Sequence, residues 1–153
     1  MDRVSKIANL YIATLRAIYL TGQFSHWTTR GLGAYGEHLL FERLYGNAQK
    51  DADLAAEKFI GLLGEDACDY ELQAKYIHDL QAKYADHAME KLELSLAIVK
   101  DFLAFSDQVY AEMEKEGVLS LGLDDCIMGI ASNQEEACYL LQQSLAQSKV
   151  SDE

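Results

Sequence analysis

Hydrophobic residues recur along the chain at the intervals of an α-helix. Near the N-terminus they follow one another at spacings of three and four, which places them on a single helix face. The members of this stripe are Val4, Ile7, Tyr11, Leu15 and Ile18. We therefore predict a first helix over about residues 3–29, ending near Gly31 and Gly33.

The same reasoning predicts three more long helices. The second spans about residues 34–63, with Gly64 as its C-cap. Its apolar residues are Leu39, Leu40, Leu44, Leu54, Phe59 and Leu62. The third spans about residues 83–116, where Gly117 ends it, and the fourth runs from about residue 121 or 124 to 147.

The charged, tyrosine-containing stretch at 65–80 is too short for a main bundle helix, so we expect a connection with a short helix of its own. Short links within the first and last helix pairs make antiparallel hairpins, whereas the long middle link permits a crossover. The sequence contains no proline to interrupt these helices. The prediction is an all-α four-helix bundle with a short helix in the crossover, forming one domain over residues 1–153.

Composition predicts a compartment and excludes some partners. Apolar runs are short and broken by charge, so we expect no membrane span or secretory leader, and a cytoplasmic location. Three cysteines, Cys68, Cys126 and Cys138, fit a reducing compartment as small buried apolar residues. The net charge is −12 at pH 7 and no lysine-rich tail occurs. We therefore expect no binding to nucleic acid, whereas an acidic surface suits cations.

Potential metal ligands concentrate between residues 26 and 57. His26 lies at the end of the first predicted helix. On the second, His38 and Glu42 are four residues apart, as are Asp53 and Glu57. Residues at this interval share a helix face and can direct two donor groups to one point. Imidazole combined with carboxylate suits iron or another first-row divalent metal better than calcium or magnesium.

The spacing of the two pairs predicts a site shared between two copies of the chain. Glu42 and Asp53 are about 16 Å apart along one helix, so a single chain cannot bring both pairs to one metal. Positions 38 and 57, like 42 and 53, are symmetric about positions 47–48. Two antiparallel copies of this helix would place His38 opposite Glu57 and Glu42 opposite Asp53. Small residues at the centre permit close approach: Gly46, Asn47 and Ala48. Such an isologous dimer would hold two equivalent sites.

Each of these features also has a simpler explanation. An isolated acid pair such as Asp53 and Glu57 is commonly a solvated helix face. A histidine alone on a helix is commonly a surface residue or a satisfied core residue. His78 and His87 stand alone, and we assign them no role.

The set His26-Trp27, His38, Glu42, Asp53 and Glu57 resembles the ferroxidase motif of the Dps proteins (DNA-binding proteins from starved cells), a branch of the ferritin-like proteins. In that family a His-Trp dipeptide ends the first helix. The second helix then carries a histidine, an acid four residues later and an Asp-x-x-x-Glu pair. The stretch NQEEACYLLQQSL, at 133–145, resembles the family's last helix more weakly. The Glu-x-x-His element that builds ferritin sites within one subunit is missing from this sequence.

Two departures from the family pattern stand out. The family usually has aspartate where this chain has Glu42, and the extra methylene changes the reach of that carboxylate. The basic tail with which some members bind DNA is also missing.

The resemblance implies a ferritin-like fold and a dodecameric shell built from two-fold dimers. It also implies iron storage: Fe(II) would be oxidised by hydrogen peroxide or oxygen and kept as ferric mineral. His26, His38, Asp53 and Glu57 would bind the iron, with Glu42 a ligand or a nearby base. The alternative is a structural shell with a weakened or zinc-occupied site and no ferroxidase activity, supported only by Glu42.

Two further features carry paired interpretations. Trp27 would be an electron donor beside the site or a large interfacial anchor. Asp124 and Asp125, at the start of the fourth predicted helix, would line an acidic pore through which cations enter, and Asp125 falls where the resembled family often places a pore carboxylate. Both acids are equally suited to the N-terminus of the fourth helix, whose dipole favours negative charge.

Overall fold

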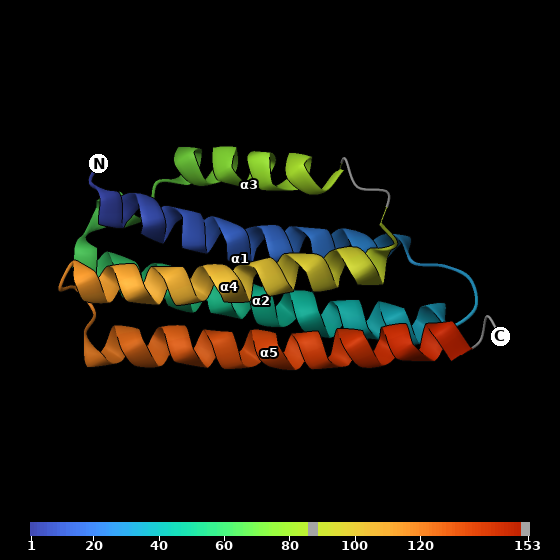
Figure 1. The fold of residues 1–153 in the computed structure, drawn as a ribbon. Helices are drawn as coiled ribbons and strands as arrows, with labels where there is room; N and C mark the ends of the chain where they lie inside the picture. Colours follow the sequence, from blue (N-terminus) through green and yellow to red (C-terminus); the bar gives the residue numbers. More distant parts are fainter. Residues whose placement is uncertain (86–88, 151–153) are drawn as a thin grey trace.

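Four long helices lie side by side, and a fifth packs against them (Figure 1). The structure is a computed structural model that describes residues 1–85 and 89–150, with side chains as far as residue 146. Its helices are α1 (Arg3–Thr28), α2 (Ala34–Leu63), α3 (Tyr70–Ala85), α4 (Lys91–Lys115) and α5 (Leu121–Val150), with a 3-10 turn η1 (Glu65–Ala67) before α3. The described residues contain no strand. The all-α, four-helix-bundle prediction is confirmed.

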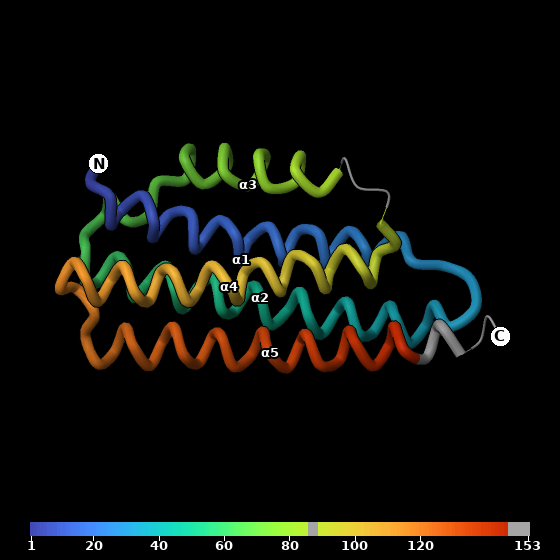
Figure 2. Tube along the Cα trace, viewed as in Figure 1, coloured from blue at the N-terminus to red at the C-terminus, as the bar shows by residue number. Residues whose placement is uncertain are grey.

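The four long helices form a closed ring. α1 packs against α2, α2 against α5, α5 against α4, and α4 against α1. The fifth helix, α3, packs on α1 and lies along it on the side away from α2 and α5 (Figure 2). The link from α2 to α4 therefore crosses the bundle and carries α3 with it, as the long middle connection predicted.

The first hydrophobic stripe forms part of the core. Tyr11 is fully buried and contacts Phe59 and Phe102, with ring centroids 5.7 and 5.1 Å away. These rings come from α1, α2 and α4, so they join three of the four bundle helices. Leu15 is also fully buried, and Ile18 is nearly so. Burial of such large apolar side chains is the main source of stability in a bundle of this kind.

Glycines follow the first two helices as predicted, and an aspartate that the sequence analysis did not name caps the start of α1. The side chain of Asp2 caps α1 by accepting a hydrogen bond of 2.7 Å from the Ser5 amide. Gly31 and Gly33 both have positive φ and form the turn between α1 and α2. Gly64 ends α2 at φ +89°, which confirms its role as the cap.

The third long helix begins later than predicted. Residues 83–85 belong to α3, and α4 starts only at Lys91, after Glu90 in an extended conformation. Asp86 and His87 lie outside the described residues. The reason for the longer α3 is tertiary: Tyr84 is buried, and its hydroxyl donates to the Asp101 carboxylate on α4. This packing extends α3 to its last turn, which a local pattern does not reveal.

The buried side chain of Asn9 makes four of the hydrogen bonds at the junction between α1 and the crossover. Its Nδ2 donates to the carbonyl oxygens of Ser5 and Asp66, both at 2.9 Å. Its Oδ1 accepts from the Asp69 amide at 2.7 Å and from Gln73 Nε2 at 3.1 Å. Asn9 is fully buried, so its amide replaces the water that the start of the crossover would otherwise need.

None of the described helices combines the length and the hydropathy needed to cross a membrane.

Candidate metal centre

His26 and His38 form a stacked pair where α1 ends and α2 begins. Their ring centroids are 3.7 Å apart with an angle of 21° between the planes. His26 Nδ1 donates to the backbone oxygen of His38, and His38 Nδ1 donates to that of His26, both at 2.8 Å. A carbonyl oxygen can only accept, so each Nδ1 carries the proton. The turn at Gly31 and Gly33 brings the two residues together.

This exchange of hydrogen bonds leaves the other nitrogen of each ring with its lone pair. Histidines that bind metals usually donate one ring N–H to a carbonyl or carboxylate, which fixes the tautomer and orients the ring. Both Nε2 atoms can therefore bind a cation without any rearrangement of the histidine corner, that is, of His26, His38 and the turn between them. Both rings are half-buried, so they remain accessible from outside the chain.

The two helices approach closely just behind this pair. Gly22 of α1 is buried, and a Cβ at that position would lie 3.1 Å from the Cβ of Tyr45 on α2. The Tyr45 ring in turn packs edge-on against His26, with centroids 5.3 Å apart. Tyr45 thus supports the histidine corner from behind, and Gly22 makes room for it. The sequence analysis did not single out either residue.

Glu42, Asp53 and Glu57 are exposed on α2. They do not join the histidines: among the residues with described side chains, no group of three or more His, Cys, Asp or Glu side chains could hold a metal ion. The fold of one chain thus brings His26 and His38 together, but it does not gather the three acids around them. A four-residue interval does place Asp53 and Glu57 on one face of α2.

The exposed face of α2 also carries large apolar residues. Tyr35 is 77% exposed, Leu39 45% and Ile60 38%. At 100° per residue, Tyr35, Glu42, Asp53 and Ile60 all fall within about 20° of one line along the helix. A face that mixes such apolar side chains with acids is unusual for a surface that stays in water.

Trp27 is adjacent to His26 in sequence and is 67% exposed. Its side chain is available at the same corner as the histidines. This exposure fits an interfacial anchor and an electron donor equally well, so both interpretations of Trp27 remain predictions.

Asp124 lies in the first turn of α5 and Asp125 follows it directly, yet their surroundings differ. Asp125 is exposed, whereas Asp124 is half-buried. The pKa of the Tyr110 phenol on α4 is raised, first by its desolvation and then by the nearby Asp124 carboxylate. Asp124 therefore faces its own chain, and Asp125 is the acid available to a pore.

The three cysteines are free. Cys126 is buried, as expected, whereas Cys68 and Cys138 are only half-buried. Burial raises the pKa of the Cys126 and Cys138 thiols, which keeps both in the unreactive protonated form. Cys68 accepts a hydrogen bond from Gln73 Nε2 at 3.4 Å.

The structure also contains a buried acid that the sequence analysis did not identify. Asp51 of α2 is 3% exposed and accepts hydrogen bonds of 2.9 Å from Asn133 Nδ2 and 3.0 Å from Gln134 Nε2 of α5. Burial raises its pKa despite these two bonds. A signal was present: Asp51 continues the spacing of the buried residues Leu44, Ala48 and Ala55.

Comparison with known proteins places the fold. No family model matches the sequence, and no curated protein sequence matches it. Among solved structures, Dps from Thermosynechococcus elongatus is similar over 94% of this chain and 90% of its own, with a TM-score of 0.76 and 20% identity.

Two other Dps structures agree with this result. Dps from Microbacterium arborescens, solved in a high iron form, has a TM-score of 0.71 and 17% identity, and the match covers 95% of this chain and 97% of that one. A C-terminal deletion mutant of Mycobacterium smegmatis Dps has a TM-score of 0.74 and 17% identity, with coverage of 93% and 96%. The chain therefore has the ferritin-like fold of the Dps proteins, as its motif suggested.

Proposed function

We propose that this chain is an iron-storage and detoxification protein that binds Fe(II) between two subunits, oxidises it and keeps the ferric product inside a closed shell. The observation that carries the proposal is the histidine corner. Two stacked imidazoles, each fixed through Nδ1 by the other residue's carbonyl, leave two Nε2 atoms free of these hydrogen bonds. Paired imidazoles with carboxylates nearby suit Fe(II).

The remaining ligands would come from a second copy of the chain. The exposed acids of α2 lie along one face of an unbroken helix of 30 residues. Antiparallel pairing of two such faces about positions 47–48 brings Asp53 and Glu57 of one chain to His38 and Glu42 of the other. Tyr35 and Ile60 obey the same symmetry, because positions 35 and 60 also lie at equal distances from 47–48. Tyr35 would then cover Ile60 across the interface and exclude water beside each site.

The proposed chemistry is a redox reaction in which iron is the substrate. Each Fe(II) gives up one electron, and one hydrogen peroxide accepts two electrons and two protons to leave as two waters. The protein supplies binding, geometry and carboxylates that favour the more highly charged Fe(III). Each chain has a net charge of −12, so a shell of such chains would also attract the Fe(II) cation.

A mixed-subunit experiment tests the shared site. One variant lacks His38 and Glu42, the other lacks Asp53 and Glu57, and all four are replaced by alanine. Each variant alone should be inactive in Fe(II) oxidation, because every site has lost two ligands. Random co-assembly should restore roughly a quarter of the wild-type rate per subunit, since about half the dimers are mixed and each of these retains one intact site.

The matched control is a variant in which His38, Glu42, Asp53 and Glu57 are all replaced by alanine. When it co-assembles equally with wild-type chains, neither site of a mixed dimer is complete, so roughly a quarter of the activity should remain. If each site lay within a single chain, roughly half of the wild-type oxidation rate should remain in this control. The mixture of the two double variants should then show no restored activity. Native mass spectrometry confirms that mixed assemblies form before the rates are compared.

The same assay decides between storage and a structural scaffold. Ferric absorbance that grows faster than in a protein-free control supports ferroxidase activity. Metal binding without such oxidation would support the scaffold in place of the function proposed here.

A further inference from the structure

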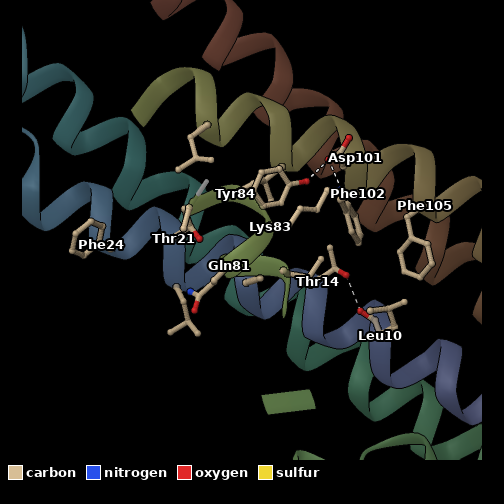
Figure 3. A pocket seen from close by; sticks show the side chains of 16 residues that line it. Leu10, Thr14, Thr21, Phe24, Gln81, Lys83, Tyr84, Asp101, Phe102 and Phe105 are labelled. Atoms are coloured by element: carbon tan, nitrogen blue, oxygen red, sulfur yellow. Dashed lines mark hydrogen bonds and ion pairs between the residues drawn. The ribbon is translucent and has the colours of Figure 1, made fainter. Parts of the chain in front are cut away.

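A large apolar cavity lies on the opposite side of α1 from α2. Its volume is about 480 Å³, and α1, α3 and α4 form its walls (Figure 3). Phe24 comes from α1, while Ile98, Phe102 and Phe105 come from α4. Protein interiors are close-packed, and spaces of this size are typical of sites for small organic molecules.

The two charged side chains at this cavity are paired with each other, and Thr21 and Gln81 add neutral polar groups to its lining. The Tyr84 hydroxyl donates to the Asp101 carboxylate, and Lys83 Nζ lies 3.6 Å from the same carboxylate. Burial and the adjacent Asp101 both raise the pKa of Tyr84, so its phenol stays protonated and remains the donor. Deeper in, the Thr14 hydroxyl donates to the Leu10 carbonyl at 2.8 Å. Among the described lining residues, the one positive and the one negative side chain thus form an ion pair, and neither is left without an opposite charge.

The cavity is separate from the proposed iron site. Of the lining residues that the structure describes, none comes from α2 or α5. A dimer that pairs the exposed faces of α2 would therefore leave the cavity open. Its apolar lining is also deeper than a surface patch, since Ile98 is 5% exposed and Phe102 fully buried.

We propose that this cavity binds a neutral, mainly apolar small molecule of aromatic or aliphatic character. Apolar walls contributed by three helices provide the binding energy through burial of the ligand. Lys83 and Asp101 form an ion pair with side chains 60% and 55% exposed, so a charged ligand would leave water for apolar walls without an unpaired opposite charge to meet it. The proposal does not depend on iron chemistry.

A matched pair of fluorophores tests both parts of the proposal in the full-length assembled protein. N-phenyl-1-naphthylamine is neutral, and 1-anilinonaphthalene-8-sulfonate differs from it by one sulfonate. The neutral probe should show enhanced, blue-shifted emission that saturates at one molecule per chain. The sulfonate should bind at least tenfold more weakly. Asp101→Asn should reduce the difference in affinity between the neutral probe and the sulfonate, because it leaves Lys83 without its carboxylate partner.

Filling the cavity should abolish binding of the neutral probe. Ala17 lines the cavity and is 3% exposed, so Ala17→Phe places a ring in the space. Thr21→Phe does the same from a half-buried position and serves if Ala17→Phe does not fold. The matched control is Ala74→Phe, the same added ring at an exposed position of α3 that does not line the cavity.

The expected result is a loss of affinity of at least tenfold in the filled variants and no change in the control. Circular dichroism verifies that each variant is helical, and light scattering verifies that its assembly is unchanged. Equal affinity in the filled variants and in Ala74→Phe would overturn the proposal. Equal affinity of the wild type for the two probes would overturn the selectivity for neutral ligands.

Discussion

Replacing Asn9 by alanine should detach the crossover from α1. The side chain is fully buried and makes hydrogen bonds to three residues beyond its own helix: Asp66, Asp69 and Gln73. The Asn9→Ala variant removes all of them and leaves two donors, the Asp69 amide and Gln73 Nε2, without their acceptor. Gln73 is itself 2% exposed, so water cannot easily replace Asn9 there.

The expected loss of stability follows from these orphaned groups. A buried donor left without a partner costs about 1–3 kcal/mol. The loss of folding free energy should lie high in that range for the buried Gln73 amide and low in it for the half-buried Asp69 amide. The expected total is about 2–4 kcal/mol. For a chain of this size that corresponds to a fall in Tm of roughly 4–16 °C.

Urea unfolding at one fixed subunit concentration measures this loss, because assembly makes stability depend on concentration. Gln143→Ala, which removes an exposed amide from α5, is the control and should change stability by less than about 0.5 kcal/mol. Hydrogen exchange should also show that the amides of α3 lose protection before those of α1. An Asn9→Ala variant within about 0.5 kcal/mol of the control would refute the reasoning.

Two further predictions concern acids. Burial raises the pKa of Asp51 above its ordinary value of 3.8, so the folded state is favoured at low pH and loses that advantage as pH rises through the folded pKa. The Asp51→Asn variant cannot titrate at this position. Its stability relative to the wild type, measured by urea unfolding, should therefore increase as pH is raised from about 4 to about 7. A decrease in that relative stability would contradict the prediction. Asp125→Asn should slow Fe(II) uptake at low ionic strength and have less effect at high salt, whereas the same change at the inward-facing Asp124 should matter less. Equal stopped-flow rates for Asp125→Asn and wild type would eliminate the pore.

The fold could be predicted largely because its signals are local. The stripe from Val4 to Ile18 and the capping glycine at 64 both depend on neighbours in sequence, and both appear where expected. The boundary between α3 and α4 was wrong because it depends on a tertiary contact. The side chain of Tyr84 reaches Asp101 on another helix, and no local pattern records that bond.

The candidate site was predictable only in part, for a similar reason. Spacing alone grouped His38 with Glu42 and Asp53 with Glu57 on α2. The exchange of hydrogen bonds between His26 and His38 depends instead on how tightly the turn at Gly31 closes, which the sequence does not specify. Tyr45 was missed because its contribution is the packing of its ring against His26, which a search for metal ligands by spacing does not reveal.

Gly22 restricts how this chain can change in evolution. A methyl group there would meet Tyr45 at 3.1 Å, and that ring supports His26. Drift at position 22 would therefore alter the histidine corner from behind, although the residue has no charge and no donor atom for a metal. Among relatives that keep both histidines, we expect glycine at this position to persist, and a larger residue there to be accompanied by a smaller one at position 45.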